Sequence, residues 1–191
     1  MALRGAIDQK LTSSLFGGVE FSKRDLTVPN LLDVSDPFNP VNRDGHWNEY
    51  LGRAYLFWTP HPWLALRAQY LFELFERELI GPTELDTQRV PLGIGFFHPS
   101  GLSASLTATH WDQDGTFTFF FDPSVPVRSG SDDFWTVDAA ISYRLPKRYG
   151  LISVGATNLF DEEFNFFEVD FGNPTIQPTR TVFARVTLAF P

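Results

Sequence analysis

Every second side chain is apolar over residues 134–145, and this alternation constrains the fold of the chain more than any other feature of the sequence. The apolar set consists of Trp135, Val137, Ala139, Ile141, Tyr143 and Leu145, and the other set consists of Phe134, Thr136, Asp138, Ala140, Ser142 and Arg144. Because successive side chains of a strand point to opposite faces, the pattern predicts a β-strand with one apolar face. Placing Arg144 on that face would cost about 2–4 kcal/mol at the midplane of a bilayer. The run therefore predicts a strand between an apolar medium and a wetter one.

The same alternation recurs along the chain and predicts an antiparallel all-β fold. The expected strands cover residues 13–27, 48–58, 63–75, 89–97, 102–109, 134–145, 151–157 and 181–190, after a lead-in of mixed character. A helix over residues 64–79 is the competing interpretation of the third run, because that stretch is rich in good helix formers. In the fourth run, Pro91 lacks a backbone donor and needs a bulge or an unpaired position.

The connections between these strands alternate in length. Short ones fall near Thr59, His98 and Pro146, and long ones cover residues 28–45, 77–87, 113–131 and 161–179. Outer-membrane barrels have this asymmetry, with short periplasmic turns and long extracellular loops. The sequence therefore predicts a single domain over residues 1–191, an antiparallel up-and-down transmembrane β-barrel of about eight strands, which is either self-contained or an incomplete fragment of a larger barrel. Both chain ends are expected on the periplasmic side.

Composition and charge narrow the function classes. No run of about 18 apolar residues is present, which argues against a transmembrane helix. Aromatic residues make up 16% of the chain and fall near the ends of the alternating runs, as in interfacial girdles. The net charge of −8 argues against a nucleic-acid partner, and the absence of cysteine excludes disulfides and thiolate metal sites. The first ten residues contain no apolar signal segment, so an exported chain of this kind is expected to be a piece of a longer one.

The C-terminal part carries a motif. Residues 154–161 read Val-Gly-Ala-Thr-Asn-Leu-Phe-Asp, and residues 178–180 read Pro-Thr-Arg directly before the last alternating run. In these residues the chain resembles the C-terminal end of the TonB-dependent receptor barrel family. The motif positions are Asn158, Leu159, Phe160, Asp161, Arg180 and Phe190. Residues 97–102, 112–115 and 134–146 are also similar to the receptor-like barrel of some tetratricopeptide-repeat outer-membrane proteins.

The resemblance implies a large barrel, typically of about 22 strands, that imports iron chelates, cobalamin or similar ligands with energy from a TonB complex. The chain departs from this pattern in three respects. Its expected strands cover about the last third of such a barrel, no plug domain or TonB box is recognisable, and Phe190 is followed by Pro191 where the family usually ends on an aromatic residue. Ligand-dependent transport by this piece alone is therefore not expected.

Ionisable residues share the predicted inner face of the strands. They are Arg53, Arg67, Glu73, Arg89, Asp138, Arg144 and Arg185. In a wide barrel they would line a water-filled lumen and set its electrostatics. If about eight strands closed alone, the interior would hold only side chains, and the same residues would pair as salt bridges. The sequence leaves both arrangements open.

Other polar clusters are weaker candidates. His110 with Asp112 and Asp114 resembles a general base beside carboxylates, but the alternation puts His110 and the neighbouring threonines on opposite faces. Residues 112–115 begin like a calcium loop but lack its later ligands. Acidic residues in the last long loop could bridge lipopolysaccharide through divalent cations, although simple solvation is the favoured interpretation, and His61 and His98 are best read as turn residues. The sequence thus predicts no catalytic residue, metal or cofactor.

The sequence therefore predicts a barrel wall for uptake or transport in the outer membrane of a Gram-negative-type bacterium, and not an enzyme. The expected partners are the lipid bilayer and lipopolysaccharide, with the barrel-assembly machinery and a TonB complex reached through sequence outside this chain. The alternatives are a small self-contained barrel that anchors or binds at the surface, and a soluble β-barrel that binds an apolar ligand.

Overall fold

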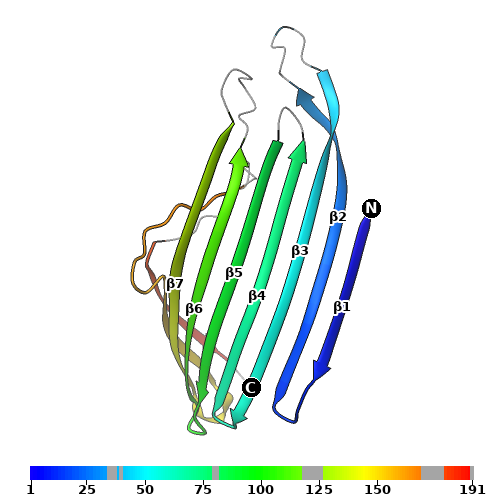
Figure 1. Ribbon diagram of the computed structural model, residues 1–191. Helices are drawn as coiled ribbons and strands as arrows, with labels where there is room; N and C mark the ends of the chain where they lie inside the picture. Colours follow the sequence, from blue (N-terminus) through cyan, green and yellow to red (C-terminus); the bar gives the residue numbers. More distant parts are fainter. Residues whose placement is uncertain (34–37, 39–40, 79–81, 118–126, 169–178, 190–191) are drawn as a thin grey trace.

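The chain forms one nine-stranded antiparallel sheet in which each strand pairs with its neighbours in sequence (Figure 1). The computed structural model describes residues 1–191 except 34–37, 39–40, 79–81, 118–126, 169–178 and 190–191. The strands are β1 (Ala2–Lys10), β2 (Leu15–Asp33), β3 (Val41–His61), β4 (Leu64–Glu78), β5 (Pro82–Phe97), β6 (Leu102–Phe117), β7 (Arg128–Arg144), β8 (Gly150–Thr157) and β9 (Thr181–Leu188). A 3₁₀ turn, η1 (Pro146–Arg148), joins β7 to β8. Within the described residues, no helix is long and apolar enough to span a membrane.

The sheet is open, so the nine strands do not close into the self-contained barrel, which was one of the two arrangements that the sequence left open. No ladder joins β1 to β9, and every residue of both strands is exposed. The prediction of about eight strands missed β1, because Gly5 and Gln9 interrupt the apolar set of the lead-in. Pairing with β2 sets its register nonetheless, with Ile7 opposite Val19. With nine strands, β1 and β9 run in the same direction, so the prediction that both chain ends lie on one side was also wrong.

The strands extend further into the predicted long loops than the alternation indicates. β2 continues to Asp33 and β3 begins at Val41, so part of the predicted 28–45 loop is strand. The predicted 77–87 and 113–131 loops are shortened in the same way, since β5 begins at Pro82 and β6 ends at Phe117. These extensions carry polar residues, whose backbones gain ladder hydrogen bonds although their side chains show no apolar period. The short connections near Thr59, His98 and Pro146 lie together at the opposite end of the sheet (Figure 1).

Two local questions left by the sequence are settled by pairing. Residues 64–78 form β4, so the helix alternative was wrong: strand neighbours on both sides override helix propensity. Pro91 interrupts one ladder, because the β4–β5 pairing passes from Ala68 directly to Leu71. On its other side Pro91 stays in register opposite Thr109.

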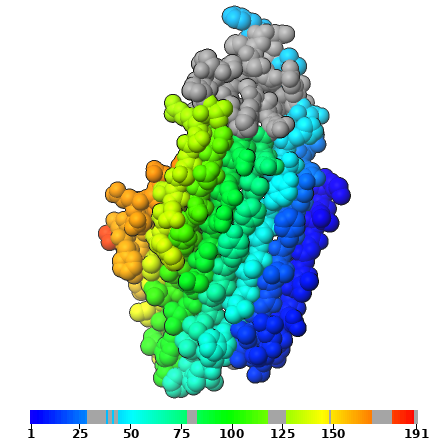
Figure 2. All heavy atoms as spheres, in the orientation of Figure 1, coloured from blue at the N-terminus to red at the C-terminus, as the bar shows by residue number. Residues whose placement is uncertain are grey.

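The pairing registers divide the side chains into two faces of unlike chemistry. In Figure 1 the β8–β9 end curls behind β5–β7, and the side facing the viewer is convex. Figure 2 shows this convex side as a broad surface formed by neighbouring strands. Here the convex side is called the apolar face and the concave side the polar face. The few buried apolar side chains include Leu85 and Phe134, both on the polar face.

Candidate functional site

A band without a charged side chain crosses the apolar face from β1 to β9. Its members include Ile7, Leu15, Val19, Phe21, Ala54, Leu56, Leu64, Leu66, Ala68, Val90, Leu92, Ile94, Leu102, Ala104, Leu106, Ala108, Val137, Ala139, Ile141, Ile152, Val154, Val182, Ala184, Val186 and Leu188. Many are strongly exposed, including Ile141 at 60% and Val186 at 63%. Exposed apolar area of this extent marks a surface that contacts protein or membrane.

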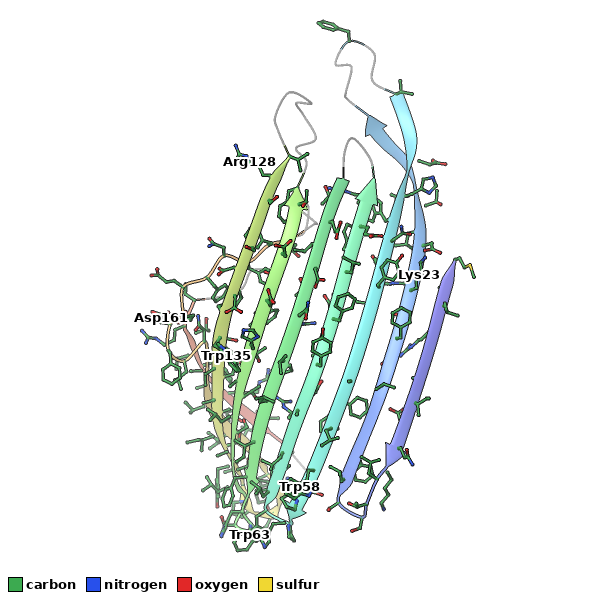
Figure 3. All side chains as sticks on the ribbon, viewed as in Figure 1. Lys23, Trp58, Trp63, Arg128, Trp135 and Asp161 are labelled. Atoms are coloured by element: carbon green, nitrogen blue, oxygen red, sulfur yellow. The ribbon has the colours of Figure 1, made fainter. Side chains whose placement is uncertain are left out.

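Aromatic side chains border the band at two levels. Trp58 and Tyr143 lie on the apolar face near the short turns, and Tyr50 and Trp135 lie on it eight positions further up the same two strands. Figure 3 labels Trp58 near the short turns and Trp135 well above it. In β7 the stretch from Trp135 to Tyr143 is nine residues long, counting both ends. This length falls within the range of about 9–11 residues for a transmembrane strand. The arrangement matches an apolar band between two aromatic girdles.

The seven ionisable residues singled out in the sequence all lie on the polar face. Arg89 forms an ion pair with Glu73 at 2.8 Å, and the Arg89 guanidinium lies 5.1 Å from the centre of the Trp111 ring. Arg53 donates a hydrogen bond to Gln69 at 3.2 Å. Among the described residues, Arg144 and Arg185 make no ion pair. The polar face is thus neither a continuous salt-bridge network nor apolar.

One arginine on this face crosses an intervening strand. Arg67 in β4 donates to the Thr107 hydroxyl in β6 at 2.7 Å, although β5 lies between them. Its side chain passes over Gly93, where an added Cβ would lie 2.7 Å from Arg67 Cγ. Glycine at this position therefore lets the guanidinium reach two strands along the concave surface.

The Asn-Leu-Phe-Asp motif forms a compact corner where β8 ends. Asn158 and Asp161 both have a positive φ, at 47° and 61°. The Asn158 side chain is 3% exposed, donates to Glu162 O and accepts from Glu162 N, both at 2.9 Å. Asp138 accepts from Asn158 N at 3.0 Å, so one of the predicted inner-face carboxylates holds the corner in place.

The other motif residues close the base of the last loop. Asp161 accepts a hydrogen bond from Arg180 N at 2.9 Å, and the two side chains form an ion pair at 3.5 Å. Leu159 N donates to Val137 O, which attaches the corner to β7, whereas Phe160 is largely exposed. Phe190 lies outside the described residues. The motif is therefore structural in this chain, and it sets where the chain turns away from the sheet.

Residues 159–168, here called the inner segment, pack against the polar face. The Phe164 ring stacks on Phe134 with centroids 4.2 Å apart, and the Phe166 ring meets Trp111 edge-on at 5.7 Å. Asn165 N donates to Asp132 at 2.5 Å. The sequence predicted an acidic outer loop over this stretch, so its packing against the sheet was not foreseen. The signal available was its four phenylalanines, which a purely solvated loop would not need.

A cavity of about 530 Å³ lies between the inner segment and strands β2–β6. Four of its charged lining residues form two ion pairs, Arg24 with Glu49 and Arg89 with Glu73, and Glu168 also lines the cavity. Aromatic side chains, Trp111 among them, complete the wall. This cavity combines polar and aromatic groups on the concave side, as a solute-facing surface would.

The remaining polar candidates lie elsewhere. The His110 ring forms a hydrogen bond with the Asp133 carboxylate at 2.9 Å on the convex side. Thr107 and Thr109 lie on the opposite face of the sheet. No group of three residues suited to a metal ion occurs among the described residues. His61 and His98 lie at adjacent turns, and the centre of each imidazole ring is 5.3 Å from the centre of the Trp63 ring.

An acidic cluster lies on the convex side above the upper aromatic level. Its carboxylates are Glu84, Asp86, Asp112 and Asp114. Burial raises the pKa of Asp86 above its ordinary value, and the charges of Asp112 and Asp114 add to the rise, while a hydrogen bond with Gln88 opposes it. This part of the sheet lies above the band, and burial together with the neighbouring carboxylates disfavours the ionised form of Asp86.

Comparisons with protein families, with curated proteins and with solved structures found no match. The chemistry of the two faces therefore carries the functional argument.

Proposed function

We propose that this chain is part of the wall of an outer-membrane β-barrel that serves ligand uptake or transport. Its apolar face contacts lipid between the two aromatic levels, and its polar face lines a water-filled lumen. The residues above the upper level lie at the lipopolysaccharide side, and the short turns lie in the periplasm. In this role the chain is a scaffold and a solute-facing surface, and it carries out no chemical step.

The segregation of charge between the faces is the observation that carries this proposal. Within the band, β7 presents Trp135, Val137 and Ile141 on one side, and Asp138 with Arg144 on the other. A soluble sheet with an exposed apolar face of this size would be expected to associate or to be covered. Lipid acyl chains cover the apolar side chains over the whole height of the band, while water solvates the ionisable residues on the opposite face.

The motif corner supports the assignment to a receptor-type barrel. The Asn158–Asp161 turn, its tie to Arg180 and the strand that follows form one unit at the end of the sheet. These are the positions on which the resemblance to the TonB-dependent receptor family rests. The polar and aromatic cavity beside the inner segment fits a wall that contacts a passing solute.

Tryptophan fluorescence in vesicles tests the proposal. The five tryptophans allow single-tryptophan variants, with the others changed to phenylalanine. In vesicles of phosphatidylcholine with brominated acyl chains, Trp58 and Trp135 should be quenched strongly. Trp111, on the opposite face, is the matched control and should be quenched little.

Two results would refute a membrane wall. One is a monodisperse monomer in plain buffer, which would favour a soluble β-protein that binds an apolar ligand. The other is quenching of Trp111 equal to that of Trp135 in membrane-inserted protein, which would place lipid on both faces.

A further inference from the structure

The two edges of the sheet have unpaired backbone groups and run in the same direction. β1 pairs only with β2, and β9 pairs only with β8, among the described strands. Ile7 in β1 is 69% exposed and Val186 in β9 is 63% exposed, so the apolar band reaches both edges without a break. An edge strand within a membrane leaves its outward N–H and C=O groups without water, at a cost of several kcal/mol for each group.

We infer that this wall is completed by an odd number of further amphipathic β-strands, antiparallel to β1 at one seam and to β9 at the other. The inference rests on the proposed function, because only a membrane barrel requires both edges to be covered. All eight ladders present are antiparallel. A closed all-antiparallel barrel contains an even number of strands, so nine strands need an odd complement.

The same parity argues against a second copy as the completing element. A copy inserted in the same orientation would bring its β1 against β9, and both strands run towards the short turns. The pairing at that seam would be parallel. An assembly of any number of whole copies would have a parallel seam at every junction between copies. The nine strands closing on themselves would form the same parallel seam. Parallel pairing is slightly less stable for each residue and occurs at none of the present ladders.

The side chains of β1 and β9 indicate which residues the added strands need on each face. On the apolar face, each new strand must continue the band beside Ile7 or Val186. On the polar face, Arg185 has no hydrogen-bond or ion-pair partner among the described residues. A carboxylate or hydroxyl on the strand added to β9 would therefore lie across the seam from Arg185, as cross-strand pairs of opposite charge do. The occupant is thus an alternating strand with an acidic or hydroxyl residue on its polar side.

Disulfide mapping tests the direction of pairing, because the chain has no cysteine of its own. The first probe is a peptide copying residues 15–24, the natural antiparallel neighbour of β1. Two versions of this peptide are made, one with a cysteine at its N-terminus and one with a cysteine at its C-terminus. Each is added while the protein refolds into detergent micelles. Leu3→Cys should cross-link to the peptide's C-terminal cysteine, and Gln9→Cys to its N-terminal cysteine. At β9, a peptide copying residues 150–157 should cross-link at its C-terminal end to Val182→Cys and at its N-terminal end to Leu188→Cys.

Three outcomes would overturn the inference. One is cross-linking in the parallel sense at either edge. Another is incorporation no greater than that of a scrambled peptide. The third is a disulfide between Ile7→Cys and Val186→Cys, within one chain or between two, above the level that Ile141→Cys gives from the middle of the same face. Lipid quenching of Trp58 and Trp135 separates this failure from a failure of the proposed function, because it reports insertion whatever covers the edges.

Discussion

The side-chain amide of Gln113 pairs with the backbone of Phe167 as a strand would. Gln113 Nε2 donates to Phe167 O at 3.2 Å, and Phe167 N donates to Gln113 Oε1 at 3.0 Å. Gln113 is 1% exposed and also donates to the Thr87 hydroxyl at 3.0 Å. Gln113 thereby fixes Phe167 to the polar face, in addition to the contacts that Phe164, Asn165 and Phe166 make there.

Gln113→Ala should loosen the inner segment near Phe167 while the sheet persists. Removing the amide leaves the backbone groups of Phe167 without partners, at a cost of about 1–3 kcal/mol. We expect chymotrypsin to cleave at Phe164 and Phe166 much faster than in the wild type, with an unchanged far-ultraviolet circular dichroism spectrum. Gln69→Ala, which removes an amide on the same face from outside the inner segment, is the control. Equal cleavage rates for Gln113→Ala and the wild type would contradict the role of this pair.

Substitutions of Asn158 should separate two contributions at the corner. Asn158→Gly keeps access to the positive φ but loses both side-chain hydrogen bonds to Glu162, at about 1–3 kcal/mol. Asn158→Ala loses the same bonds and adds left-handed strain of about 1–2 kcal/mol. Urea unfolding in micelles should therefore rank wild type above Asn158→Gly and Asn158→Gly above Asn158→Ala. An alanine variant as stable as the glycine variant would show that the backbone conformation there is not strained.

The stability contributed by Asp86 should depend on pH. Its folded-state pKa lies above the ordinary value of 3.8, chiefly because of burial. The protonated form is therefore favoured by folding below the unfolded pKa, and this stabilisation is lost as pH rises through the folded pKa. Asp86→Asn should be more stable than the wild type at about pH 7, and the difference should shrink towards about pH 4. Urea midpoints of both proteins at the two pH values would check this, and a constant difference would contradict it.

A methyl group at Gly93 should collide with the Arg67 side chain. Gly93→Ala places a Cβ about 2.7 Å from Arg67 Cγ and should cost about 1–3 kcal/mol. Gly52→Ala is the matched control, since its Cβ would meet Phe72 Cβ at an ordinary 3.6 Å. Adding Arg67→Ala to Gly93→Ala should recover part of the loss, measured as a coupling energy in a double-mutant cycle. Strictly additive effects would mean that Arg67 is not held over Gly93.

A charge on the apolar face should be far more costly in a bilayer than a charge on the polar face. Ile141→Arg, near the middle of the band, should destabilise the protein in vesicles by about 2–4 kcal/mol. Ala140→Arg, one position away and on the polar face, should cost much less. Urea unfolding monitored by tryptophan fluorescence in vesicles compares the two. Equal losses would argue against lipid on the convex side.

The faces of individual strands followed from sequence alone. Asp138 and Arg144 were assigned to one side of β7 because side-chain alternation is a local property of an extended chain. The same reasoning grouped Arg53, Arg67 and Arg185 correctly on one face, although they lie in three different strands. Their roles in a lumen remain predictions.

Only the tertiary structure decided how the strands associate. The pairing of β1, with Ile7 opposite Val19, and the open edge at Val186 depend on which distant backbone groups meet, and side-chain period carries no information about that. The inner segment is a similar case, because the partner of Phe167 is Gln113, 54 residues away in the chain. Local alternation therefore determined the chemistry of each face, whereas long-range hydrogen bonding determined that nine strands form an open sheet with a segment folded onto its concave side.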